Sequence, residues 1–220
     1  MCGRFTLAKS PERVASAFNL GAVPHFPPRY NIAPSQPVGV IVLRNDSTMP
    51  EFRLMRWGLI PAWAKDPAIG ANLINARSET VAEKPSFRSA FKYRRCLIPT
   101  DGFYEWQKLA RGMKQPFYFS MADNALFAFA GLWESWNDIE TCTILTTSAN
   151  SLLQTVHDRM PVILQPDHYA RWLDPHIHDS RQLAELLKPF PDKAMQAVPV
   201  STRVNSAKVD DALCIEPLAE

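Results

Sequence analysis

The 220-residue chain lacks any apolar run of about 18 residues that could span a bilayer, because Arg, Lys, Asp or Glu interrupts every candidate stretch. The first residues also lack the basic segment followed by a long apolar segment that is typical of a secretory signal peptide. We therefore expect a cytoplasmic protein that makes no contact with membranes.

Cysteine is scarce and scattered, with no C-x-x-C pair; the four residues are Cys2, Cys96, Cys142 and Cys214. That spacing indicates neither a zinc knuckle nor a dense disulfide framework, so we expect reduced thiols. Net charge is also low, at +2. This balance permits an anionic partner but falls short of the strongly basic character of a dedicated nucleic-acid module.

Low-complexity linkers, internal repeats and long blocks of like charge are absent too, which predicts one domain over residues 1–220. The 19 prolines instead divide the chain into many short elements. Strands, each rich in β-branched or aromatic residues, are predicted at 38–43, 52–57, 95–98, 103–108, 116–121, 126–132, 142–146 and 197–200.

Short helices are predicted between these strands. A helix through Phe18 begins at Ser10-Pro11, since Ser suits the N-cap and Pro the first turn, and others are expected at 78–83, 87–92, 148–156, 167–173 and 181–187. Because most strands follow one another without an intervening helix, we predict the α+β class. The single domain would be built on a curled, barrel-like mixed or antiparallel β-sheet with short flanking helices.

Cys2 directly follows the initiator methionine, and a small second residue favours removal of Met1. Cys2 would then carry an α-amine of pKa about 8 and a thiol of pKa about 8.5 on one carbon skeleton. Toward an aldehyde, the amine can form a Schiff base and the thiol can close a five-membered thiazolidine ring. Taken alone, a cysteine at this position is more often only the residue after the start codon.

A series of motifs accompanies Cys2 along the chain: MCGRF at 1–5, RYNIAP at 29–34, RWGLIP at 56–61, NARSET at 75–80, CLIP at 96–99 with GFYEW at 102–106, HDRMP at 157–161, and PVS at 199–201 with VN at 204–205. In this order they resemble the SRAP family, named for SOS response-associated peptidases, over essentially the whole chain. The tail after Asn205 is less typical of the family.

Four residues are candidate catalytic groups. Alternation along 102–107 places Glu105 on a strand flanked by aromatics, where a carboxylate can have the raised pKa that acid–base catalysis needs. His157 is predicted in a loop ended by Pro161, where an imidazole can transfer protons near neutral pH. The alternatives are a solvated glutamate and a structural histidine. The resemblance implies catalytic roles for Glu105 and His157, and a supporting role for Asn75 beside Cys2.

The resemblance also implies a DNA-binding surface. Asn75 and Arg77 would point the same way from an extended chain, although without the resemblance such a pair more often forms a helix-entry turn that pairs with local carboxylates such as Glu79. The expected DNA contacts are Arg4, Arg29, Asn31, Pro34, Trp63, Arg77, Arg159 and Arg203, the arginines for phosphates and the tryptophan for unpaired bases. Trp57 is a weaker stacking candidate.

These residues predict an enzyme that bonds Cys2 covalently to the ring-opened deoxyribose aldehyde of an abasic site in single-stranded DNA, through a thiazolidine. Strand cleavage by β-elimination and reversal of the crosslink are possible further activities. We expect a monomer, associated with the nucleoid when it acts on DNA, that needs no cofactor and no metal; the H-x-H of His176 and His178 is typical of a polar loop.

The alternatives are a cysteine peptidase with Cys2 as N-terminal nucleophile, which cleaves its own leader, and a non-enzymatic single-strand-binding module.

Overall fold

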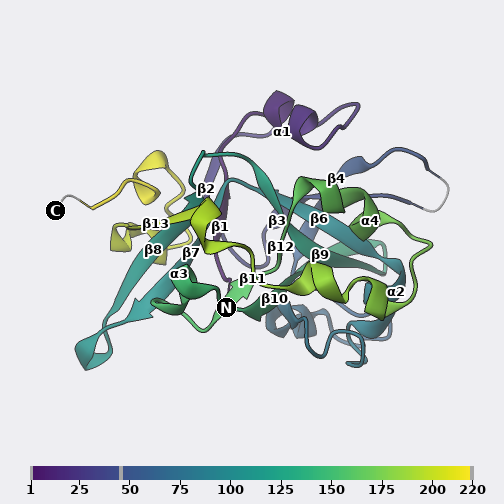
Figure 1. Cartoon of the computed structure of the whole chain (residues 1–220). Helices are drawn as coiled ribbons and strands as arrows, with labels where there is room; N and C mark the ends of the chain where they lie inside the picture. The colour runs from purple at the N-terminus through teal and green to yellow at the C-terminus, as the bar shows by residue number, and fades with distance from the viewer. Residues whose placement is uncertain (1, 45–46, 219–220) are drawn as a thin grey trace.

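Five strands close into a small barrel (Figure 1). They are β3 (Pro37–Val42), β4 (Glu51–Trp57), β6 (Arg95–Thr100), β9 (Phe127–Trp136) and β10 (Ile139–Ser148), paired in the order β4-β3-β6-β9-β10 with β10 returning to β4. The β10–β4 pair is parallel and the other pairs of this ring are antiparallel. The computed structural model describes residues 2–44 and 47–218. The arrangement confirms the predicted curled, mixed sheet and the α+β class.

A second, antiparallel sheet packs against the barrel. Its order is β13 (Met195–Pro199), β8 (Lys114–Met121), β7 (Gly102–Lys108), β1 (Phe5–Leu7) and β2 (Arg29–Ile32). Aromatic side chains join the two sheets: the ring centroids of Phe5 and Trp57 lie 5.2 Å apart, and those of Phe103 and Phe129 lie 5.8 Å apart. Three short strands extend the barrel sheet: β5 (Asn75–Arg77) and β11 (Arg159–Pro161) on β10, and β12 (Ile163–Leu164) on β9.

Helices are short and lie between the strands. The α-helices are α1 (Pro11–Ala17), α2 (Arg88–Tyr93), α3 (Ser151–Gln154) and α4 (Tyr169–Leu173). The 3-10 turns are η1 (Pro67–Asn72), η2 (Ala110–Gly112), η3 (Pro166–His168), η4 (Ser180–Gln182), η5 (Ala184–Leu187), η6 (Asp192–Ala194), η7 (Thr202–Asn205) and η8 (Ala212–Cys214). As predicted, Ser10 caps α1 by accepting from the amide of Arg13. Within the described residues, no helix is long and apolar enough to cross a membrane.

Several predicted elements differ from the structure. The helix expected at 78–83 is wrong: this segment is a series of turns, because the amide of Ser78 bonds to the carbonyl of Thr146 and ties the chain to β10. The helix expected at 181–187 is two 3-10 turns, and α3 covers only part of 148–156. Strands β1, β2, β5, β11 and β12 were not predicted, since two to four residues show no usable periodicity.

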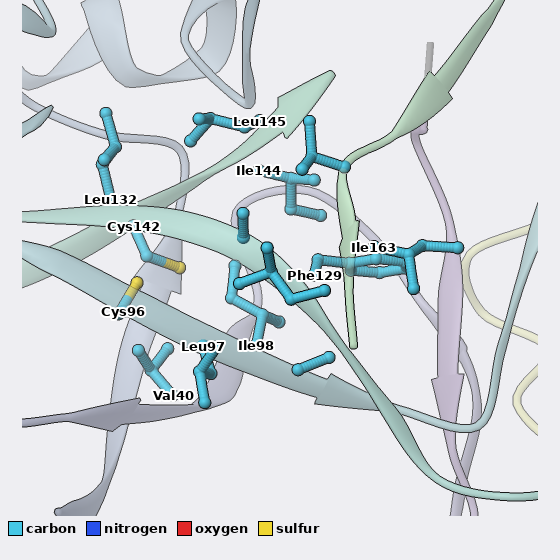
Figure 2. Packing of buried hydrophobic residues seen from close by; sticks show 14 of the residues in the cluster. Val40, Cys96, Leu97, Ile98, Phe129, Leu132, Cys142, Ile144, Leu145 and Ile163 are labelled. Carbon is cyan, nitrogen blue, oxygen red and sulfur yellow. The ribbon is translucent and has the colours of Figure 1, made fainter. Parts of the chain in front are cut away.

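The barrel interior is filled by aliphatic and aromatic side chains from every strand of the ring, including Val40, Ile98 and Phe129 (Figure 2). Cys96 and Cys142 lie inside it, and burial raises the pKa of both thiols. All four cysteines are free. The two barrel cysteines therefore act as small apolar residues of the core.

Asp101 fixes the N-terminal strand to the second sheet. The Thr6 hydroxyl donates to Asp101 Oδ1, and Oδ2 accepts from the amides of Ala8 and Lys9 at 2.7 and 3.1 Å. The carboxylate thus holds both β1 and the residues that follow it. Because Cys2 lies only three residues before β1, the same contacts set where Cys2 can lie.

We predict that Asp101→Ala lowers the free energy of unfolding by about 2–4 kcal/mol, because it leaves the amides of Ala8 and Lys9 without their acceptor and removes the hydrogen bond from Thr6. Urea denaturation measures this change, and hydrogen exchange at the amides of Ala8 and Lys9 should accelerate. Asp123→Ala is the control, since Asp123 accepts only from the exposed amide of Ala125 and its loss should change stability by less than about 1 kcal/mol. Equal effects of the two substitutions would contradict the anchoring role.

Candidate active site

Cys2 lies fully buried just before β1. Its carbonyl accepts a hydrogen bond of 2.9 Å from Nδ2 of Asn75, the first residue of β5. Residues 73 positions apart in sequence thus meet directly. Met1, whose removal the sequence predicts, lies outside the described residues.

The amide of Asn75 has a second, unused atom. Its Oδ1 is buried and accepts no hydrogen bond among the described residues. Buried carbonyl oxygens are rarely left without a donor, so such an atom indicates a place for one. An amine at Cys2, or a hydroxyl of a bound molecule, is a suitable donor for this oxygen.

Glu105 lies on β7 with its side chain on the barrel side of the sheet, as the alternation of residues predicted. Phe103 joins the main core, whereas Tyr104 packs in a smaller cluster on the opposite face. Glu105 is only 2% exposed, and this burial raises the pKa of its carboxyl to about 7. A carboxyl with this pKa can both give and take a proton near neutral pH.

Glu105 acts on the Cys2 thiol through its charge. Burial raises the pKa of the thiol above its ordinary range, and the negative charge of Glu105 raises it further. The sulfur is therefore protonated at neutral pH, and it needs a nearby base to become a strong nucleophile.

His157 lies in the loop between α3 and β11, as predicted. Its Nδ1 accepts from the amide of Arg159 at 3.0 Å and lies equally close to a carboxylate oxygen of Asp158. Burial lowers the pKa of the imidazole, so it is neutral near pH 7. Because the Nδ1 lone pair accepts from the Arg159 amide, Nδ1 carries no proton and its contact with Asp158 is not an ion pair. The proton of the neutral imidazole therefore lies on Nε2.

The His157 loop adjoins the end of β7. Gln107 Nε2 donates to the carbonyl of Thr155 at 2.9 Å, and residues 106–108 and 154–158 line a polar groove of about 390 Å³ between them. Gln107 is two residues beyond Glu105 on the same face of the strand, so the His157 loop contacts β7 close to Glu105. The predicted groups Cys2, Asn75, Glu105 and His157 thus come from four separate segments to one region.

The predicted DNA contacts divide by exposure. Arg77 is exposed and has no hydrogen-bond partner among the described residues, and Trp63 is 60% exposed. Both can therefore contact a nucleic acid without any rearrangement. Pro34 is half-buried.

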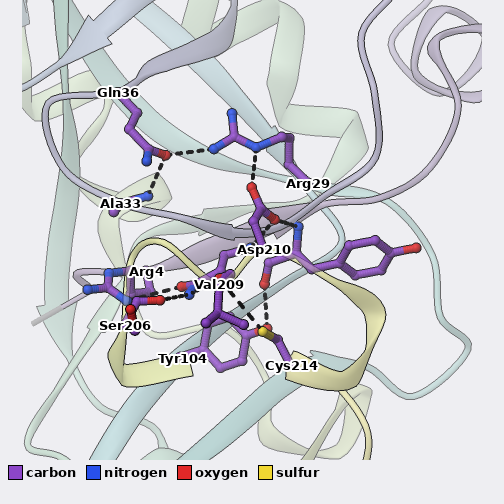
Figure 3. A network of polar contacts seen from close by, with 11 residues as sticks. Arg4, Arg29, Ala33, Gln36, Tyr104, Ser206, Val209, Asp210 and Cys214 are labelled. Carbon is purple, nitrogen blue, oxygen red and sulfur yellow. Dashed lines mark hydrogen bonds and ion pairs between the residues drawn. The ribbon is translucent and has the colours of Figure 1, made fainter. Parts of the chain in front are cut away.

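Other predicted contacts are engaged inside the protein (Figure 3). Asn31 is fully buried, and its amide donates to the carbonyls of Val204, Ser206 and Val209. Arg4 donates to Asn31 Oδ1 at 3.1 Å and to the carbonyl of Val204 at 2.6 Å. These two residues hold the C-terminal segment against β1 and β2, and their contact with DNA stays a prediction.

The remaining arginines are paired with carboxylates. Arg29 Nε lies 2.5 Å from Asp210, which also accepts from the amide of Asn31, and Arg203 lies 2.8 Å from Asp211. Arg159 is paired with Glu79. Nothing in the spacing of Glu79, Asp210 or Asp211 in the sequence indicates these arginine partners, because each pair joins segments that meet only in the folded chain or across a turn.

Trp57 is a core residue, so the weaker expectation that it stacks on DNA is wrong. It is fully buried and its Nε1 donates to the carbonyl of Ile74 at 2.8 Å. Gly58 follows with φ +128°, and a Cβ there would lie 2.6 Å from the carbonyl oxygen of Gly70. The glycine of the W-G motif therefore lets the backbone at Gly58 lie against the backbone at Gly70, which a side chain would prevent.

No group of three or more His, Cys, Asp or Glu side chains in the described part of the chain could hold a metal ion. His176, His178 and Asp174 do not form such a group. The chemistry that the arrangement supports is that of its own thiol, carboxyl, amide and imidazole.

Fold and site together define a class: a barrel protein with a buried cysteine at its second residue, supported by an asparagine, a glutamate of raised pKa and a neutral histidine. The family model described as "SOS response associated peptidase (SRAP)" matches residues 1–207. The chain therefore belongs to the SRAP family. The matched range ends two residues after Asn205.

Similar proteins match most or nearly all of this chain. The chain is 45% identical to "Abasic site processing protein YoqW" of Bacillus subtilis, with 98% of this chain and 99% of that protein covered. It is 32% identical to "Abasic site processing protein HMCES" of Gallus gallus, covering 87% of this chain and 66% of that protein. A crystal structure of a protein from Bacteroides thetaiotaomicron has a TM-score of 0.89 at 27% identity, covering 99% of this chain and all of that one.

We predict that Glu105→Gln changes how stability depends on pH. Below pH 4.5, Glu105 is protonated in both states; between pH 4.5 and about 7 the unfolded chain releases the proton that the native state keeps, so the wild type loses stability as pH rises. The variant lacks this loss. Its stability relative to the wild type should therefore rise by on the order of 1–3 kcal/mol over this window and then level off. Urea denaturation at several pH values tests this, and a pH-independent difference would contradict it.

Proposed function

We propose that the protein processes abasic sites by covalent attachment of Cys2 to the deoxyribose aldehyde in single-stranded DNA. The observation that carries the proposal is the meeting of Cys2, Asn75 and Glu105 in one buried region. Support comes from the similar proteins, which are named abasic site processing proteins. In this proposal the whole chain acts as one SRAP-like domain, as a monomer, and without cofactor or metal.

The reaction begins after removal of Met1. The α-amine of Cys2 adds to the C1′ aldehyde of the ring-opened deoxyribose to form a carbinolamine. Glu105, protonated near its pKa of about 7, donates a proton to the departing hydroxyl, and water leaves as the Schiff base forms. Asn75 Oδ1 accepts from the amine and orients it.

The thiol then closes the ring. Glu105, now a carboxylate, takes the proton from the Cys2 thiol as sulfur bonds to C1′ of the iminium, and a thiazolidine results. One water is lost overall. Because the thiol is protonated at rest, its attack depends on this base, and the same carboxyl serves both steps.

His157 and Arg77 have supporting roles in the proposal. The Nε2–H of neutral His157 donates a hydrogen bond to the free hydroxyl of the ring-opened sugar and orients the sugar during ring closure or its reversal. Arg77, two residues from Asn75 on the same side of β5, lies about 6.6 Å further along the strand and binds the neighbouring phosphate. If the Schiff base instead loses the 3′ phosphate by β-elimination, the product is a broken strand.

The family name favours a second candidate, a peptidase with Cys2 as N-terminal nucleophile. Amide hydrolysis by cysteine uses a thiolate, which a lowered pKa provides. Here burial and Glu105 raise the pKa of the thiol, which favours attack on a reactive iminium over attack on an amide. Cleavage of the protein's own Met1 is compatible with either function.

We predict that the protein lacking Met1 forms a heat-stable adduct with a single-stranded oligonucleotide that contains one abasic site. Its mass should equal protein plus DNA minus one water. Denaturing gels and intact mass spectrometry measure it, and Cys2→Ala and a variant that retains Met1 should give none. No adduct from processed wild type would refute the proposal, and Cys2-dependent turnover of a peptide library would then support the peptidase.

We predict that Glu105→Gln slows adduct formation by about 100-fold or more, since a glutamine can neither protonate the hydroxyl nor accept the thiol proton. The rate of adduct formation on a denaturing gel measures this. Glu140→Gln is the control. Glu140 forms ion pairs with Arg44 and Arg53, each at 2.8 Å, near the start of β10, whereas Asn75 pairs further along that strand. Loss of the Glu140 carboxylate should leave the rate of adduct formation unchanged. A wild-type rate for Glu105→Gln would remove Glu105 from the mechanism.

A further inference from the structure

Arg159 lies two residues after His157, and its guanidinium is held by Glu79. Nη1 and Nη2 lie 2.5 and 2.9 Å from the two carboxylate oxygens, and Nη2 also donates to the carbonyl of Thr146 at 2.7 Å. This paired geometry is the one that a guanidinium adopts with a phosphate. Glu79 therefore occupies the face of Arg159 that a nucleic-acid backbone would need.

Arg77 lies beside this ion pair. It is the register partner of Thr146 in the parallel β5–β10 pair, and Thr146 is the residue whose carbonyl receives Arg159. Glu79 follows Arg77 by two residues. Two guanidinium groups and one carboxylate thus share the edge of β10 next to Asn75 and Cys2, with one positive charge in excess.

The two partners of the ion pair differ in exposure. The side chain of Arg159 is 14% exposed, whereas that of Glu79 is 50% exposed. Arg159 also keeps a buried Nε without a hydrogen-bond partner among the described residues. Because the guanidinium also donates to the carbonyl of Thr146, Arg159 keeps a partner within the protein when the carboxylate, which lies on the solvent side, moves away.

We propose that Glu79 competes with DNA phosphate for Arg159: it holds the guanidinium in the DNA-free protein, gives it up when a single strand binds across Arg77 and Arg159, and so weakens binding to undamaged strands. The proposal rests on the proposed action on single-stranded DNA. Its ligand is a phosphodiester of any base sequence.

The exchange is energetically feasible. A phosphodiester offers Arg159 the same paired geometry as the carboxylate and contacts Arg77 as well, so it can replace the half-exposed carboxylate of Glu79. Hydrogen bonding to Arg159 lowers the pKa of Glu79, so the carboxylate stays charged at neutral pH and the competition persists. The covalent step, and not the backbone contacts, would then discriminate abasic from intact strands.

The test is Glu79→Gln, measured by fluorescence anisotropy on an intact single-stranded oligonucleotide over a range of salt concentrations. Glutamine keeps the shape and a hydrogen bond to Arg159 but removes the competing charge. We expect affinity about threefold or more above the wild type at low salt. We also expect the plot of log K against log salt to steepen by about 0.7, the value for one further phosphate contact on a single strand.

Two controls separate this effect from general charge. Glu140→Gln makes the same charge change at a carboxylate that bridges two arginines, six residues or about 20 Å from Thr146 along β10, and it should bind like the wild type. In an Arg159→Gln background, Glu79→Gln should lose most of its gain, because the two residues act on one contact. Circular dichroism establishes that each variant is folded.

Unchanged or weaker binding by folded Glu79→Gln overturns the proposal and makes Glu79 a positioning residue for Arg159. An equal gain in Glu140→Gln, or a full gain without Arg159, overturns it as well. Adduct formation with an abasic oligonucleotide is measured in parallel on the wild type. A wild-type adduct with no Glu79 effect refutes this inference alone, whereas a missing adduct with the expected Glu79 effect refutes the covalent function alone.

Discussion

The carboxylate of Asp101 is the constraint on which the site depends. It accepts from Thr6, Ala8 and Lys9, and so fixes a strand of only three residues that pairs with β7 through Phe5 and Thr6. A strand this short has few ladder hydrogen bonds to keep it in register. The buried carboxylate adds the missing contacts, and the chain before the strand is thereby directed into the region where Asn75 and Glu105 lie.

The same burial that holds the N-terminal segment also sets the chemistry. In water, Glu105 would be fully ionised at neutral pH; on the barrel side of β7 its pKa is about 7. The Cys2 thiol is kept protonated by burial and by that carboxyl. Burial is the main reason that the pKa values of both groups are raised. The site therefore holds a carboxyl that can donate a proton and a thiol that is protonated at neutral pH.

Three of the arginines predicted to bind DNA are paired with carboxylates. Arg29 and Arg203 are paired with Asp210 and Asp211 of the C-terminal segment, and Arg159 is paired with Glu79. The pairs at Asp210 and Asp211 join the segment beyond η7 to β2 and to itself, which indicates a structural purpose. The low net charge of the sequence, +2, is thus accompanied by local pairing, since each of these arginines has a carboxylate beside it.

Much of this was predictable from the sequence, and some was not. The barrel strands, the α1 cap, the loop at His157 and the face of Glu105 follow from periodicity, proline and capping preferences, which are local. The motifs also indicated the family and the four candidate catalytic residues. The very short strands, the burial of Asn31, the pKa of Glu105 and the partners of the arginines were decided by the tertiary structure alone, because they depend on segments that are distant in sequence and meet only when the two sheets pack.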